Sequence, residues 1–156
     1  MALTLTVISI AALSLLIFVW SRRVKDQDQL RQHSISAEEL HSLLLVSDQP
    51  VLVFDVRQPL DFLAYPEIIP GAQRIRPDEV LEKPALIPKE KDAIVYCTCP
   101  SDKTSRTVVR RALESQITRI KVLKGGLAGW KSKGYPVEPY QEVFQLYAPS
   151  LTPPGR

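Results

Sequence analysis

The sequence predicts an α/β domain with a mostly parallel sheet flanked by helices, preceded by one N-terminal transmembrane helix. Three observations predict this architecture. An uncharged apolar run occupies residues 2–20. Short apolar, β-rich segments then alternate with segments of helical periodicity, which is typical of a parallel sheet. The connections are short and no internal repeat is visible, so a chain of 156 residues is expected to hold one such domain.

The N-terminal run extends from Ala2 to Trp20 without a charged residue. About 19 residues at a rise of roughly 1.5 Å each are enough to cross a ~30 Å hydrocarbon core. Trp20 stands where an aromatic ring favours the membrane interface, and Arg22, Arg23 and Lys25 follow it. Because basic flanks tend to remain in the cytoplasm, we expect a single-pass membrane protein with a cytoplasmic soluble domain.

Two other interpretations of this run fit less well. A cleaved signal peptide would have a basic start, a shorter apolar core and a cleavage site between small residues, and the run has none of these. A buried helix of the globular domain is the other alternative, but the run is apolar on every face.

The chain is therefore divided into four parts: a transmembrane helix (2–20), a polar juxtamembrane linker (21–34), the α/β domain (35–138) and a proline-rich C-terminal tail (139–156). The formal net charge is only +3, and the basic residues after the anchor are scattered along the chain. Nucleic-acid binding would need them clustered, so no nucleic-acid partner is predicted.

The domain begins with a capping box, in which Ser36 is the N-cap and Glu39 stands three residues later. It opens an amphipathic helix whose apolar positions are Leu40, Leu43 and Leu44. The other elements expected in chain order are a strand at 50–56, a short helix at 58–65, a turn and strand at 68–75, a strand at 92–97, a helix at 105–116, a strand at 119–123 and a helix at 127–134.

Both cysteines of the chain, Cys97 and Cys99, lie at the end of the strand "DAIVYC". Two cysteines are too few for a disulfide framework, and they fall short of the four ligands of a structural zinc site. The only histidines, His33 and His41, lie far upstream and are interpreted as surface residues. No metal and no cofactor are predicted.

Ligands of open parallel sheets bind beyond the carboxyl ends of the strands, which is where Cys97 stands. A helix is expected to begin near Thr104 or Ser105, and its first N–H groups carry partial positive charge. A thiol near them would have a lowered pKa and could act as a thiolate nucleophile, with Lys103 adding charge. The alternative is an inert thiol, because free cysteine is common in protein cores.

Several segments resemble, in order and spacing, a rhodanese-like (sulfurtransferase) domain. They are "VFDVRQPLDF", "IPGAQRI", "IVYC" and "VLKGGLAGWKSKGYPVE", and the resemblance covers roughly residues 35–138. It implies a cysteine that accepts sulfane sulfur from a donor such as thiosulfate or a persulfide and passes it to a thiol acceptor. The "IVYC" strand assigns this nucleophile to Cys97, with Cys99 as the alternative. Asp55 and Arg57 would connect loops as structural support.

The resemblance also implies that loop amides cradle the sulfur. The residues concerned are Thr98, Cys99, Pro100, Ser101, Asp102, Lys103, Thr104 and Ser105. The usual family loop reads Cys-x-x-Gly-x-Arg-Ser, whereas this loop, "CTCPSDKTS", has no glycine and no arginine. Counted back from Ser105, Cys99 takes the nucleophile position and Thr104 replaces the arginine. A Cys-x-Cys-Pro loop also occurs in rhodanese modules associated with bacterial membrane proteins.

The expected function is transfer of sulfane sulfur through a cysteine persulfide at the membrane surface. The second thiol could resolve that persulfide, or it could only fill space. The alternative function is a catalytically inactive rhodanese-fold module that binds a partner or senses oxidation through its thiols. The longer loop counted from Cys97 resembles that of dual-specificity phosphatases, but Lys103 cannot form the two-pronged contact that arginine makes with an oxyanion. Phosphatase chemistry is therefore not expected.

Overall fold

Five parallel strands form the centre of the domain in the computed structural model, which describes residues 2–46 and 51–140. They are β1 (Ser34–Ile35), β2 (Leu52–Asp55), β4 (Gln73–Arg74), β5 (Ala93–Tyr96) and β6 (Ile120–Leu123), in the order β1-β6-β5-β2-β4. Every pairing between them is parallel, which confirms the predicted sheet. A small antiparallel pair, β3 (Glu67–Ile68) and β7 (Glu138–Pro139), lies beside it.

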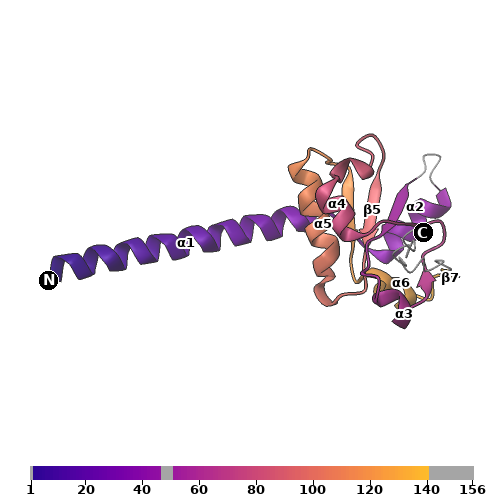
Figure 1. The fold of residues 1–156 in the computed structure, drawn as a ribbon, viewed down its shortest axis with the longest axis horizontal. Helices are drawn as coiled ribbons and strands as arrows, with labels where there is room; N and C mark the ends of the chain where they lie inside the picture. Colours follow the sequence, from indigo (N-terminus) through magenta and orange to yellow (C-terminus); the bar gives the residue numbers. More distant parts are fainter. Residues whose placement is uncertain (1, 47–50, 141–156) are drawn as a thin grey trace, which may run out of the picture.

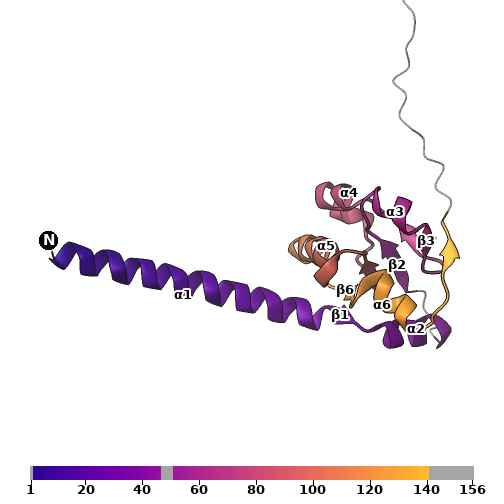
Figure 2. The same cartoon turned by 90° about the horizontal axis from the view of Figure 1, so that it is seen from below.

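Helices cover both faces of this sheet. The α-helices are α1 (Ala2–Gln32), α2 (Ala37–Val46), α3 (Asp61–Ala64), α4 (Pro77–Glu82), α5 (Lys103–Glu114) and α6 (Gly126–Ser132), with short 3-10 turns η1 (Pro84–Leu86) and η2 (Pro100–Asp102). Figures 1 and 2 show α4 and α5 on one side of the central strands and α2 and α6 on the other. The predicted helices flanking the sheet are therefore confirmed.

The alternation of side chains along β5 divides the interior into two cores. Val95 and Cys97 belong to the core beneath α4 and α5, whereas Ile94 and Tyr96 belong to the core beneath α2 and α6. All four are at most 2% exposed, as expected for a central strand of a parallel sheet. The two-residue period of a strand therefore places Cys97 on the α5 side.

The capping box at the start of α2 forms as predicted. The Ser36 amide donates to Glu39 Oε2 at 2.8 Å, and the Glu39 amide donates to Ser36 Oγ at 3.2 Å. The apolar face of this helix is narrower than its periodicity suggests, because Leu40 is fully buried while Leu43 and Leu44 remain 39% and 40% exposed. Only the first turn of α2 reaches the sheet.

The helix α1 continues through the segment 21–32 that we expected to be a linker, and it projects from the domain (Figures 1 and 2). Its last turns are attached to the domain: Leu30 is 5% exposed within the core beneath α5, and His33 Nδ1 lies 2.9 Å from the Ile120 carbonyl oxygen. Within the described part of the chain, no helix is both long and apolar enough to cross a membrane. The side chains of residues 2–12 lie outside that part.

The predicted C-terminal tail begins at residue 139 with the end of β7. Tyr140, the last described residue, donates its amide to the Pro66 carbonyl at 2.9 Å, and its ring lies 5.0 Å from that of Phe62. Residues 141–156, which make up the rest of the tail, lie outside the described residues.

Candidate active site: the cysteine loop

The cysteine loop begins at the carboxyl end of β5 and is anchored there by α6. Cys97 directly follows the strand, and its carbonyl oxygen accepts a hydrogen bond of 3.1 Å from the Leu127 amide. Gly126, at the start of α6, allows this close approach, since a Cβ there would lie 2.0 Å from the same oxygen. The start of the loop is thus held between the sheet and the N-terminus of α6.

The backbone of the loop turns sharply at Ser101 and Asp102, whose φ angles are +63° and +55°. Both angles fall in the left-handed region, which aspartate tolerates better than most residues. The Asp102 side chain is buried, and its Oδ2 accepts a hydrogen bond of 3.0 Å from the Gly125 amide. This turn delivers the chain to α5, which begins at Lys103.

The first turn of α5 contacts the sulfur of Cys99. The Thr104 amide donates to Cys99 Sγ at 3.2 Å, and Thr104 Oγ1 lies 3.4 Å from the same sulfur. The unpaired N–H groups and partial positive charge of a helix N-terminus stabilise a thiolate. We expected this interaction at Cys97; Thr104 contacts Cys99 instead, whereas Ser105 in the same turn acts on Cys97.

The two thiols contact each other, with Cys97 Sγ 2.7 Å from Cys99 Sγ. They differ in exposure, since Cys97 is 1% exposed and Cys99 is half-buried. Residues two apart on an extended chain point to the same side, which explains the juxtaposition.

The environments of the thiols move their pKa values in opposite directions. Burial, with a smaller contribution from the Cys99 thiol, raises the pKa of Cys97 to about 11, and hydrogen bonds with Ser105 offset only part of this. Partial burial also acts to raise the pKa of Cys99, but hydrogen bonds with Cys97 and Thr104 outweigh it, so this pKa lies below its usual value. Cys99 is therefore the more readily ionised of the two thiols.

The loop can also be counted back from Ser105 against the family pattern Cys-x-x-Gly-x-Arg-Ser. Asp102 then occupies the position of the family glycine, and its φ of +55° is one that glycine adopts readily. Thr104 occupies the arginine position and contacts the Cys99 sulfur. Both observations favour Cys99 as the nucleophile, whereas the strand "IVYC" alone favours Cys97.

The remaining predicted loop residues lie in different surroundings. Lys103 is exposed at the first position of α5, and Ser101 is exposed at the turn. Ser105 is fully buried beside Cys97, whose pKa it acts to lower. The side chain of Pro100 lies outside the described residues.

Thr98 points to the other side of the loop, into a cavity of about 390 Å³. The other residues lining this cavity are Tyr65, Leu127, Ala128, Lys131 and Ser132. Four of these come from α6, so the cavity lies between α6 and the segment after α3. Sequence reasoning missed it because its walls are distant in the chain.

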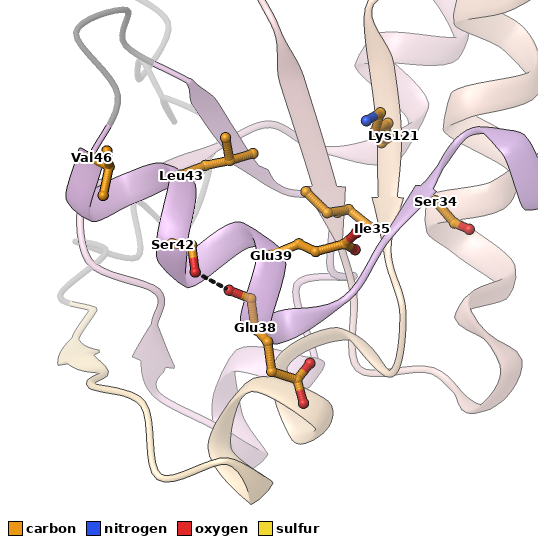
Figure 3. A pocket seen from close by; sticks show the side chains of 8 residues that line it. All are labelled: Ser34, Ile35, Glu38, Glu39, Ser42, Leu43, Val46 and Lys121. Carbon is orange, nitrogen blue, oxygen red and sulfur yellow. Dashed lines mark hydrogen bonds between the residues drawn. The ribbon is translucent and has the colours of Figure 1, made fainter.

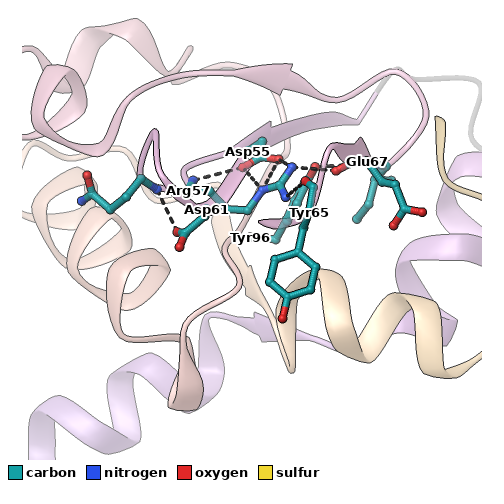
Figure 4. Close-up of polar contacts among 8 residues, drawn as sticks. Asp55, Arg57, Asp61, Tyr65, Glu67 and Tyr96 are labelled. Atoms are coloured by element: carbon teal, nitrogen blue, oxygen red, sulfur yellow. Dashed lines mark hydrogen bonds and ion pairs between the residues drawn. The ribbon is translucent and has the colours of Figure 1, made fainter. Parts of the chain in front are cut away.

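Asp55 and Arg57 are fully buried and hold the adjacent loops together (Figure 4). Arg57 Nε donates to both oxygens of Asp55, at 2.9 and 2.8 Å. Its two terminal nitrogens donate to the carbonyl oxygens of Tyr65 at 2.8 Å and Glu67 at 2.7 Å. These contacts join the end of β2 to the segment around Tyr65 and Glu67, as a supporting residue would.

A second cavity, of about 670 Å³, lies at the edge of the sheet between α2 and β1 (Figure 3). It is lined by Ser34, Ile35, Glu38, Glu39, Ser42, Leu43, Val46 and Lys121. None of these is a predicted site residue. The cavity is an apolar groove with a charged rim, and it contributes no chemistry to the cysteine loop.

Comparisons with known proteins agree with this fold. A curated sulfurtransferase of Allochromatium vinosum is 27% identical over 105 residues, which cover 67% of this chain and 94% of the relative. The rhodanese-like domain of the Alr3790 protein from Anabaena sp. is 26% identical, with a TM-score of 0.59 over 80% of this chain and 86% of that domain. A rhodanese-related protein of Thermoplasma volcanium is 27% identical, with a TM-score of 0.55 over 68% of this chain and 97% of that one. The model of the rhodanese-like domain family matches residues 36–133, and the chain belongs to this family.

Proposed function

We propose that this protein is a sulfurtransferase that carries sulfane sulfur as a persulfide on Cys99. A donor such as thiosulfate or a low-molecular-weight persulfide would supply the sulfur, and a thiol would accept it. The observation that carries the proposal is the hydrogen bond of 3.2 Å from the Thr104 amide to Cys99 Sγ at the N-terminus of α5. It stabilises the thiolate that must attack the donor, and the same amide is available to a persulfide anion.

Three further observations support the choice of Cys99. Its sulfur is half-buried and therefore accessible, its pKa is lowered, and it occupies the nucleophile position in the register counted from Ser105. The named activity of the Allochromatium vinosum relative is of the same type. The N-terminus of α5 would supply the supporting positive charge, and Lys103, the first residue of that helix, would attract anionic donors.

The test is intact-mass spectrometry of the full chain in detergent after incubation with thiosulfate or with a low-molecular-weight persulfide. Wild type and Cys97→Ser should gain one sulfur atom, and Cys99→Ser should gain none. Loss of the added sulfur only in Cys97→Ser would reverse the roles of the two thiols. No gain in any variant with any donor would refute the proposed activity.

The second candidate is an inactive module that senses oxidation through its two thiols. Their separation of 2.7 Å favours it, because neighbouring thiols oxidise readily to a disulfide. The same mass measurement separates the candidates: a module of this kind would lose two hydrogens on mild oxidation yet never gain a sulfur atom from a donor.

We also propose that residues 2–20 anchor the domain at the membrane surface, with the domain in the cytoplasm. The uncharged run and the basic residues that follow it support this orientation. An anchored chain should resist extraction by alkaline carbonate and dissolve only in detergent. Release by carbonate would refute the anchor, and protection of the domain from protease in sealed right-side-out vesicles would test the orientation.

A further inference from the structure

We propose that Cys97 resolves a persulfide on Cys99, releasing sulfide and leaving a disulfide between the two cysteines. This inference rests on the proposed function. Its geometric basis is the distance of 2.7 Å between the two sulfurs. A disulfide bond measures about 2.0 Å, so a closure of roughly 0.7 Å would join them. The domain would then have a second activity, reduction of sulfane sulfur to sulfide.

The relative depth of the two thiols suits this displacement. A thiolate attacks a disulfide-type sulfur with the leaving sulfur on the opposite side. Cys97 is 1% exposed and approaches Cys99 from the core, whereas Cys99 is half-buried. Because Cys97 fills the inner side of Cys99, the outer sulfur of a persulfide would extend toward solvent. Attack from the core would thus expel hydrosulfide outward.

The reaction balances without an external oxidant. The Cys97 thiol and the Cys99 persulfide anion give the Cys97–Cys99 disulfide and one hydrosulfide ion. The Sγ–Sγ bond forms, and the bond from Cys99 Sγ to the outer sulfur breaks. The outer sulfur gains two electrons, which the two cysteine sulfurs lose together, and it leaves with the proton of Cys97. A dithiol reductant returns both cysteines to thiols by disulfide exchange.

The surroundings of Cys97 make this step slower than transfer to a well-placed acceptor. Burial raises the pKa of Cys97 to about 11, so little of it is thiolate at neutral pH. Ser105 opposes this shift through its backbone and its buried hydroxyl, so it stabilises a Cys97 thiolate when one forms. Resolution therefore acts on persulfides that meet no acceptor, which limits how long the site holds reactive sulfur.

The experiment uses the full chain in detergent, loaded with a low-molecular-weight persulfide, freed of donor and left without acceptor. Released sulfide is trapped with an alkylating fluorophore while intact mass is followed. In wild type, the extra sulfur should disappear as one equivalent of sulfide appears. Trypsin releases both cysteines in one peptide, Asp92–Lys103, which should become two hydrogens lighter than its reduced form. The rate should not change on dilution, because the step is intramolecular.

The variants separate the possible outcomes. Cys97→Ser should load sulfur and release sulfide at least about tenfold more slowly, since the attacking thiol is absent. Equal rates in wild type and Cys97→Ser, or a wild-type peptide without a disulfide, would overturn the inference while leaving the proposed function intact. If no variant loads sulfur, both fail together. Should Cys97→Ser not fold, the mass of the wild-type peptide decides alone.

Discussion

Replacement of Gly126 by alanine tests whether close contact between α6 and the cysteine loop supports the site. The new Cβ would lie 2.0 Å from the Cys97 carbonyl oxygen and 3.0 Å from its carbonyl carbon. Both atoms belong to backbone, so neither can swing away as a flexible side chain could. The start of α6 and the end of β5 must therefore move apart.

The expected cost has three parts. The φ of Gly126 is +52°, and a non-glycine residue in this region costs about 1–2 kcal/mol. Forcing an extra carbon into a packed contact costs about 1–3 kcal/mol. Losing the hydrogen bond from the Leu127 amide to Cys97 costs about 1 kcal/mol more. We expect Gly126→Ala to lower the free energy of unfolding by roughly 3–6 kcal/mol.

Gly134→Ala is the matched control. Its φ of +74° imposes the same backbone cost, but no atom lies within 4 Å of the added Cβ. The control should lose only about 1–2 kcal/mol. Thermal unfolding followed by circular dichroism measures both variants, and a difference of ~2–4 kcal/mol corresponds to at least about 10 °C in Tm for a domain of this size. Equal Tm values would refute the contact and its role.

Three further predictions concern charge, helix docking and thiol reactivity. Arg57→Met should destabilise the domain by about 3–5 kcal/mol in denaturant unfolding, because Asp55 is left as an uncompensated buried charge. Leu30→Ala should cost about 2–3 kcal/mol in the same assay, since it removes the side chain that packs the end of α1 on the core. Alkylation of the peptide 92–103 should modify Cys99 first, at neutral pH. Cys97 should react appreciably only as pH approaches about 11, because its raised pKa keeps it protonated until then.

Each of these predictions has a clear contrary result. Leu45→Ala is the control for Leu30→Ala: Leu45 is 72% exposed, so its replacement should lower the free energy of unfolding by no more than about 0.5 kcal/mol. If Leu30→Ala lowered it by no more than this control, α1 would not be docked on the domain. Full stability of Arg57→Met would exclude a supporting role for that side chain. Alkylation of Cys97 before Cys99 would reverse the assignment of the thiolate.

The sequence by itself determined the order of β2, β4, β5 and β6 and of the helices between them, but it did not predict β1, β3, α4 or β7. Local chemistry is enough for these features. The capping hydroxyl of Ser36 and the carboxylate of Glu39 are three residues apart, which marks the start of α2. The strand before Cys97 is apolar at every position, which marks a strand that is buried on both faces. The same strand end located the candidate site, because the carboxyl ends of parallel strands are where ligands bind.

Only the tertiary structure decided which thiol contacts Thr104 at the N-terminus of α5. Two cysteines separated by one residue have the same local signature, and the choice depends on how the turn at Ser101 and Asp102 delivers α5 to the sulfurs. That turn is held in part by Gly125, which lies 23 residues further along the chain than Asp102. Burial of Leu30 is likewise a long-range effect, because a helix has no buried side until another element packs against it.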